Sequence, residues 1–225
     1  MREAKDFLTS SMIRNGCRFH DRIEAGRKLA EAVAALKPET PVVLGLPRGG
    51  VPVAAEVARR LGAPLGVILV RKLGAPGQQE LAVGAVGDGD PPVTVFNPDI
   101  LKALGLREAD LAERIAEKAS EIAERRRRYL GGRDLVPVKG RTAVIVDDGI
   151  ATGATVRAAL QVLKAQGAAR VVLAVPVGPA DVVAELSGDV DDLVCLERPE
   201  PFIAVGAHYA RFPQVEDDEV IRLLT

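Results

Sequence analysis

The stretch Ala143-Val-Ile-Val-Asp-Asp-Gly-Ile-Ala-Thr-Gly-Ala-Thr155 decides how the rest of the chain is interpreted. It opens with four apolar residues, three of them β-branched, which is typical of a buried strand in a parallel sheet. Asp147 and Asp148 follow directly, then comes a turn rich in Gly and Thr, and a helix is predicted from Val156 onward. Because ligands of open α/β sheets bind at the carboxyl ends of strands, we expect a site here.

The turn after the two carboxylates is suited to binding a phosphate. It offers the hydroxyl groups of Thr152 and Thr155, backbone N–H groups and the positive end of a helix. Asp147 and Asp148 would repel that phosphate, so their expected targets are hydroxyl groups or a divalent cation. A ribose 5-phosphate, with a phosphate beside a vicinal diol, satisfies both halves. The alternative is an ordinary strand–turn–helix unit with a capping Thr and two solvated carboxylates.

This stretch closely resembles the phosphoribosyl-diphosphate (PRPP) signature of the type I phosphoribosyltransferases. The resemblance implies that Asp147 and Asp148 hold the 2′- and 3′-hydroxyl groups of the ribose. It also implies that the turn formed by Ala151, Thr152, Gly153, Ala154 and Thr155 wraps the 5′-phosphate, and that Gly149 is among the PRPP-binding residues. Because the match joins an apolar run, an acidic pair and a turn, it is more specific than a single glycine motif.

A second anion-binding loop is predicted after the first core strand, Val42-Val-Leu-Gly-Leu46. Gly49 and Gly50 can turn backbone N–H groups toward an anion, and Arg48 adds a positive charge. In the resembling family the equivalent loop binds the pyrophosphate of PRPP, and some members carry Lys where Arg48 stands. Two such loops at two strand ends suit a substrate that has phosphate groups at both ends.

Residues 73–80, which are rich in Gly, Pro and Gln, are predicted to form a mobile loop after a strand at 65–70. The family has a flexible loop at this place, and an activated sugar must be kept from water while it reacts. Arg71 and Lys72 precede the loop. They either reach the pyrophosphate or are solvated charges at a strand end. Short strands are predicted at 81–86 and 93–96.

The alternation of strands and helices predicts an α/β fold with a doubly wound, mainly parallel sheet of about five strands. We expect one domain over 1–225, with a phosphoribosyltransferase core at about 41–197. A helical insertion is predicted at about 97–130. Its long helix, about 107–129, ends in Arg125-Arg-Arg-Arg128, which we interpret as a solvated helix end matched to the helix dipole rather than a nucleic-acid patch.

The chain ends are expected to form a small hood over the acceptor site, as in the resembling family. Phe202 and Tyr209 of the tail either stack on the ring of the acceptor or anchor the tail to the core. His20, next to a predicted helix start, is interpreted as structural.

Composition limits the class of protein. The net charge of −1 gives no support to nucleic-acid or membrane-surface binding. Cys17 and Cys195 do not make a disulfide framework, and neither a signal peptide nor a long apolar span is visible. These features predict a cytoplasmic protein with small-molecule substrates, and they leave a homo-oligomer open.

The resemblance implies displacement of pyrophosphate from C1′ of PRPP by a nucleophile, through a transition state with oxocarbenium character. Asp147, Asp148 and Arg48 would act by charge placement and orientation rather than by covalent catalysis. Mg²⁺ is the implied cofactor, carried mainly by oxygens of PRPP, so no protein metal site is predicted. Two alternatives remain: a non-catalytic, PRPP-binding regulatory protein, and a sugar-phosphate hydrolase, for which no nucleophile or metal cluster is evident.

One position departs from part of the family. Members that act on 6-oxopurines carry an Asp where this chain has Ala151, and that Asp takes a proton from the base. Members that handle adenine, orotate or uracil lack it. The resemblance therefore does not assign hypoxanthine or guanine as the acceptor.

Overall fold

The computed structural model describes residues 18–89 and 91–225. Cys17 and the predicted N-terminal part of the hood, residues 1–17, therefore lie outside the described residues. Within the described ranges, no helix combines the length and the apolar character needed to cross a membrane.

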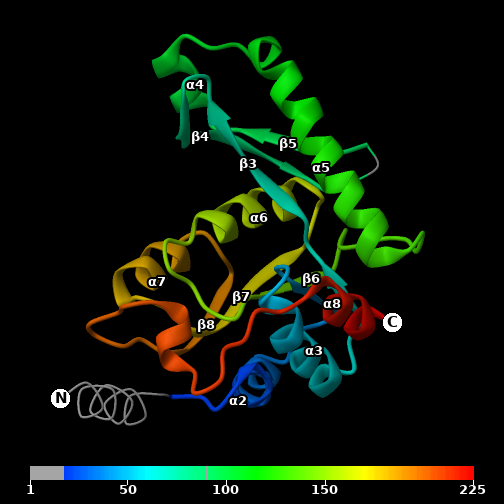
Figure 1. Ribbon diagram of the computed structural model, residues 1–225, viewed down its shortest axis with the longest axis vertical. Coiled ribbons are helices and arrows are strands. Elements are labelled where there is room, and N and C mark those ends of the chain that lie inside the picture. Colours follow the sequence, from blue (N-terminus) through cyan, green and yellow to red (C-terminus); the bar gives the residue numbers. More distant parts are fainter. Residues whose placement is uncertain (1–17, 90) are drawn as a thin grey trace, which may run out of the picture.

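The centre of the fold is a parallel sheet of five strands in the order β2-β1-β6-β7-β8 (Figure 1). Counted along the chain, this order is 2-1-3-4-5, one of the two common orders of doubly wound sheets, and it reverses between β1 and β6. The predicted doubly wound sheet is thereby confirmed. The strands are β1 (Pro41–Gly45), β2 (Leu65–Val67), β6 (Thr142–Val146), β7 (Arg170–Val177) and β8 (Asp192–Glu197).

The apolar strands bury alternate residues on the two faces of this sheet. In β6, Ala143 and Ile145 pack toward α6, whereas Val144 and Val146 pack toward α2 and α3. Cys195 is half-buried and packs against the α6 side of the sheet. The covering helices are α2 (Arg22–Ala35) and α3 (Gly50–Leu61) on one face, and α6 (Ala154–Ala165) and α7 (Ala180–Ser187) on the other.

A second sheet has three antiparallel strands, β3 (Val70–Ala75), β4 (Gln78–Gly87) and β5 (Val93–Phe96). Figure 1 shows α6 between the two sheets. The predicted single strand at 65–70 is wrong, because the chain leaves the parallel sheet after β2 and enters the antiparallel sheet at Val70. The predicted mobile loop at 73–80 is wrong as well, because Ala75 pairs with Gln78 around a two-residue turn, Pro76-Gly77.

The helical insertion contains α4 (Pro98–Leu104), the 3₁₀ helix η1 (Glu108–Leu111) and α5 (Ala112–Leu130). The C-terminal end of α5 is bonded to other elements. This corrects the interpretation of Arg125–Arg128 as a solvated helix end. Arg126 lies 3.5 Å from Asp88, and Arg128 lies 2.7 Å from Asp217 in the C-terminal helix α8 (Asp217–Leu224). The hydroxyl of Tyr129 also donates to Asp217, at 2.7 Å.

The antiparallel sheet gives a test of strand register at Gly84, which pairs with Phe96. A Cβ atom at Gly84 would lie 2.2 Å from the carbonyl oxygen of Val95, so Gly84→Ala must push two strands apart. We expect a loss of about 1–3 kcal/mol in the free energy of unfolding, measured in urea. The matched control is Gly188→Ala, whose Cβ would meet Glu185 O at 3.6 Å and should change stability by less than about 0.5 kcal/mol. Equal effects of the two variants would contradict the register.

Candidate active site

Two loops meet at the place where the strand order reverses. One follows β1 and contains Arg48, and the other follows β6 and begins with Asp147. The amide of Leu46 donates to the carbonyl of Val146, at 2.9 Å, which ties the two strand ends together. The sequence predicted a site at each strand end, and the sheet order brings the two into contact.

The loop after β1 approaches the acidic pair with its backbone. A Cβ atom at Gly49 would lie 2.0 Å from Asp148 Oδ2, and one at Gly50 would lie 2.6 Å from Val146 O. Only glycine fits at these two positions, because any side chain would occupy the space of the carboxylate or the strand. Arg48 is half-buried, and its guanidinium lies 3.6 Å from the carboxylate of Glu216. The predicted residues Gly49 and Gly50 therefore adjoin Asp148 and Asp147, respectively, and Arg48 stands next to them in the same loop.

The two carboxylates are electrostatically unequal. Burial and the neighbouring charge of Asp148 raise the pKa of Asp147 well above the ordinary value of an aspartate. Burial also raises the pKa of Asp148, but the guanidinium of Arg22 opposes that rise. The backbone amide of Asp148 donates to Asp147 Oδ1 at 2.9 Å, which fixes the orientation of the first carboxylate.

Arg22 is a site residue that the sequence analysis missed. It is the first residue of α2, and its Nε donates to Asp148 Oδ2 at 2.8 Å. Its second donor reaches the carbonyl of Pro213 at 2.7 Å, and its guanidinium carbon lies 3.7 Å from the centre of the Phe212 ring. An arginine in the first turn of a helix is opposed by the helix dipole, and this unfavourable placement is the signal that could have identified it.

The predicted phosphate turn lies at the N-terminus of α6. Gly153 precedes the helix with φ of +71°, and no side chain of the helix start caps the first turn. The side chains of Thr152 and Thr155 are exposed, as is Ala151. The first N–H groups of a helix have no partner within the helix, so this end can accept an anion.

A second residue missed by the sequence analysis, Arg157, holds the phosphate turn in place. It donates to the carbonyl of Thr152 at 2.8 Å and to the carboxylate of Glu185 at 2.6 Å. With Lys72 and Ala154 it lines a cavity of about 220 Å³ under the β3–β4 hairpin. Lys72 therefore lines the same cavity as the end of the phosphate turn, whereas Arg71 pairs at 3.0 Å with Glu121 of α5.

The two aromatic residues predicted to contact an acceptor occupy different environments. Tyr209 is buried, with its ring centre 5.5 Å from that of Phe19 and 4.9 Å from that of Phe212, and its hydroxyl donates to the backbone carbonyl of Asp148. This position supports Asp148 and offers no free ring face. Phe202 is half-buried and stacks on His208, with ring centres 5.5 Å apart.

The environment of His208 favours the neutral form of its ring. Burial lowers its pKa, so the ring is neutral near pH 7. Its Nε2 atom is buried and has no hydrogen-bond partner among the described residues. His20, by contrast, is exposed and donates its backbone amide to Glu24 while its ring lies 3.0 Å from Asp21.

The donor set is compatible with a Mg²⁺ ion that is carried by a substrate. Within residues 18–89 and 91–225, no group of three or more His, Cys, Asp or Glu side chains could hold a metal. Mg²⁺ prefers water and phosphate oxygens, and it needs few protein ligands. The residues present therefore fit an ion held by diphosphate oxygens and water.

Comparisons with known proteins agree with this geometry. Residues 19–210 match the phosphoribosyl transferase domain family. The chain is 52% identical over 206 residues to two proteins of Mycobacterium tuberculosis, named "Putative phosphoribosyl transferase MT0597" (strain CDC 1551 / Oshkosh) and "Putative phosphoribosyl transferase Rv0571c" (strain ATCC 25618 / H37Rv). Each alignment covers 92% of this chain but 46% of the relative, so the chain spans about half the length of these curated relatives.

A solved structure is similar over nearly its whole length. The crystal structure of TT1426 from Thermus thermophilus has a TM-score of 0.84 and 48% sequence identity, and the match covers 92% of this chain and 97% of that chain. The family match extends from residue 19, just before α2, to residue 210, and it includes both loops that are predicted to bind anions. The chain therefore belongs to the phosphoribosyl transferase domain family.

Proposed function

We propose that the chain transfers the 5-phosphoribosyl group from PRPP to a nucleophilic acceptor and releases pyrophosphate. One observation carries this proposal: the backbone of the Arg48–Gly50 loop closes directly on Asp148, at the point where the strand order reverses. A carboxylate pair between two anion-binding loops matches a ribose diol between two phosphate groups.

The proposed mechanism works by charge placement. Asp147 and Asp148 accept hydrogen bonds from the ribose hydroxyl groups, and the turn from Gly149 to Thr155 holds the 5′-phosphate at the positive end of α6. Arg48, the amides of Gly49 and Gly50, and Lys72 stabilise the negative charge that develops on pyrophosphate as its bond to C1′ breaks. Mg²⁺, when carried in on the diphosphate, would supply further positive charge there.

Fewer residues are assigned to the acceptor site than to the PRPP site. Phe202 is proposed to line the acceptor site, because it is only half-buried and lies in an aromatic cluster with Phe19, Tyr209 and Phe212. Tyr209 is proposed to act through Asp148 instead. The β3–β4 hairpin, whose Lys72 lies beside the phosphate turn, takes the role of cover that was predicted for a mobile loop.

Release of pyrophosphate separates this function from the regulatory alternative. The full chain is incubated with PRPP, Mg²⁺ and, one at a time, adenine, uracil, orotate, hypoxanthine or guanine. A transferase should release pyrophosphate with at least one acceptor, and Arg48→Met should reduce that rate because a charge that stabilises the leaving group is lost. Tight PRPP binding by calorimetry without any release would instead support a PRPP-binding regulator.

The unequal carboxylates predict opposite effects of two neighbouring substitutions. A raised folded pKa means that ionised Asp147 costs stability, and this cost grows as pH rises from the ordinary aspartate pKa through the raised one. Asp147→Asn should therefore raise the melting temperature, more at pH 8 than at pH 5. It should also weaken PRPP binding about 10- to 100-fold, because a charge-assisted hydrogen bond to the diol is lost.

Asp148→Asn is the matched control. It removes the charged partner of Arg22, whose side chain is only 10% exposed, so the melting temperature should fall while PRPP binding also weakens. For both variants, the melting temperature is measured by differential scanning calorimetry and the affinity for PRPP by titration calorimetry. Equal shifts of melting temperature in the two variants would contradict the assignment of Arg22 to Asp148 alone.

The alanine at position 151 predicts poor use of 6-oxopurines. Ala151 is exposed but cannot take a proton, and general-base assistance is typically worth about 10²- to 10⁴-fold in rate. Hypoxanthine turnover should therefore be slow, and Ala151→Asp should raise it without raising turnover of adenine or uracil. Efficient hypoxanthine turnover by the unsubstituted chain would show that another residue supplies the base, and His208→Ala would be the next variant.

A further inference from the structure

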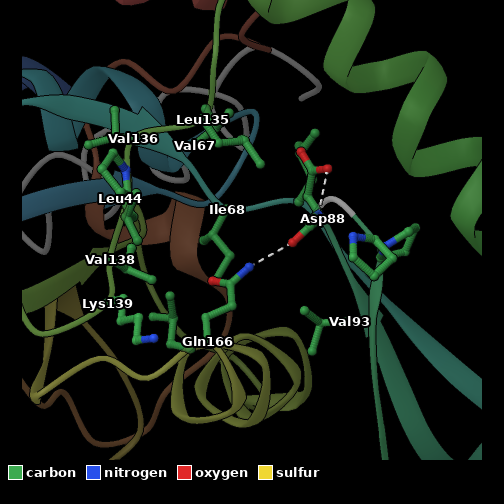
Figure 2. A pocket seen from close by; sticks show the side chains of 16 residues that line it. Leu44, Val67, Ile68, Asp88, Val93, Leu135, Val136, Val138, Lys139 and Gln166 are labelled. Carbon is green, nitrogen blue, oxygen red and sulfur yellow. Dashed lines mark hydrogen bonds between the residues drawn. The ribbon is translucent and has the colours of Figure 1, made fainter.

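Two cavities lie against α6, one near each end of the helix. The cavity at the C-terminal end has a volume of about 490 Å³, and Figure 2 shows Val93 and Val138 on opposite sides of it. Most of its lining is valine, leucine, isoleucine and proline, and its Gln166 side chain already donates to the carbonyl of Asp88 at 2.7 Å. These walls offer few groups that would select a ligand. The cavity at the N-terminal end has a different lining.

The second cavity, which we call the hairpin cavity, has a volume of about 220 Å³ and lies between the first turns of α6 and the β3–β4 hairpin. It begins at Ala154, within the turn that is proposed to hold the 5′-phosphate, and it continues along α6 through Arg157, Ala158 and Gln161. These positions are three or four residues apart, so they share one face of the helix. Gln161 is about 10 Å from Ala154 along the helix axis. The hairpin cavity therefore extends the phosphate turn along α6.

The polar groups of the hairpin cavity are cations and hydrogen-bond donors. Lys72 of β3 and Arg157 of α6 line it from two elements, and no carboxylate is among the described residues of its wall. Asn97 also lines it, and because its Oδ1 accepts the amide of Ile100 at 3.3 Å, its Nδ2 group is left as a donor. The exposed side chain of Gln161 adds a second amide. This set favours an anion, whose oxygens accept several hydrogen bonds.

The positive charge of Arg157 is only partly balanced within the protein. Its Nη1 donates to the carbonyl of Thr152, which carries no net charge, and its Nη2 donates to Glu185 of α7, which is not part of the cavity wall. The side chain of Glu185 is 68% exposed, so water weakens this ion pair. Across from the helix, the wall is formed by the small residues Ala82 and Gly84 of β4, which leave the space between the donors open.

We propose that the hairpin cavity takes a second phosphate attached to the one on the turn, so that the site binds a ribose 5′-diphosphate such as a nucleoside 5′-diphosphate. This rests on the proposed function, because it takes the turn from Gly149 to Thr155 as the 5′-phosphate site. PRPP has one phosphate at that end and would leave the cavity open. The long side chain of Lys72, assigned to pyrophosphate when PRPP is bound, would turn to the outer phosphate instead. A nucleoside 5′-diphosphate would then compete with PRPP.

The test compares ADP with AMP, which differ only in the outer phosphate. Titration calorimetry is run on the full chain without divalent ions, so that no metal bridges the phosphates. ADP should bind at least about tenfold more tightly than AMP, because charge-assisted hydrogen bonds to the outer phosphate are gained. Equal affinities would overturn the proposal and leave the phosphate turn as proposed. Failure of both nucleotides and of PRPP to bind would refute the 5′-phosphate assignment together with this proposal.

Two variants locate the outer phosphate. Gln161→Glu adds a negative charge to the hairpin cavity at an exposed position, so it should remove most of the preference for ADP while changing the affinity for AMP less than about threefold. Ser120→Glu is the matched control, because it adds the same charge at an exposed position of α5 and should leave the preference unchanged. A preference for ADP that survives Gln161→Glu, or that Ser120→Glu removes equally, would place the outer phosphate elsewhere and refute the proposal.

Discussion

The close approach of the Pro47–Gly50 backbone to Asp147 and Asp148 is the constraint on which the site depends. It requires glycine at two successive positions, since a Cβ atom at Gly49 would lie 2.0 Å from a carboxylate oxygen. It also requires β1 and β6 to be neighbours, which the 2-1-3-4-5 strand order provides at its reversal. The sheet order therefore determines which loops can share a ligand, and local sequence determines what those loops can bind.

Both ends of the described chain converge on the same carboxylate. Arg22 reaches Asp148 from the first helix, while the hydroxyl of Tyr209 bonds to its backbone carbonyl from the C-terminal segment. The guanidinium of Arg22 also lies over Phe212 and bonds to Pro213, so one cation connects the two segments. A planar guanidinium suits this task, because it can donate in the plane while its face packs on an aromatic ring. The predicted hood side of the site is therefore anchored through the residue that is proposed to bind the ribose.

The sequence predicted those parts of the structure that depend on local pattern. The run from Ala143 to Thr155 encodes a strand, a turn and a helix start within thirteen residues, and the structure contains all three. Prediction failed where composition was ambiguous: Pro76-Gly77 is typical of a loop, yet it is the tight turn of a hairpin whose strands gain stability from α6 beneath them. Propensity cannot separate these two outcomes, because packing against a distant helix decides between them.

The site residues that stand in local motifs were predictable from the sequence, whereas those that depend on tertiary contacts were not. Arg48, Gly49 and the acidic pair stand in recognisable local motifs, whereas Arg22 is 126 positions from its carboxylate partner and carries no motif. Tyr209 was predicted either to stack on the ring of the acceptor or to anchor the tail to the core, and only tertiary packing, which buries the ring and directs the hydroxyl to Asp148, separates these roles. Contacts of this kind depend on how the chain ends are folded back, which no periodicity encodes.

The electrostatics of the acidic pair explain why such an arrangement is useful in spite of its cost. Two buried carboxylates repel each other, and a single arginine, bonded to only one of them, leaves Asp147 with a strongly raised pKa. A second arginine would stabilise the free protein, but it would also occupy the acceptor positions that a diol needs. Hydroxyl groups donate without adding charge, so the proposed ribose would satisfy Asp147 while Arg22 still balances Asp148. The unequal pair therefore lacks hydrogen-bond donors. A vicinal diol would supply them, whereas a phosphate would add negative charge beside the carboxylates.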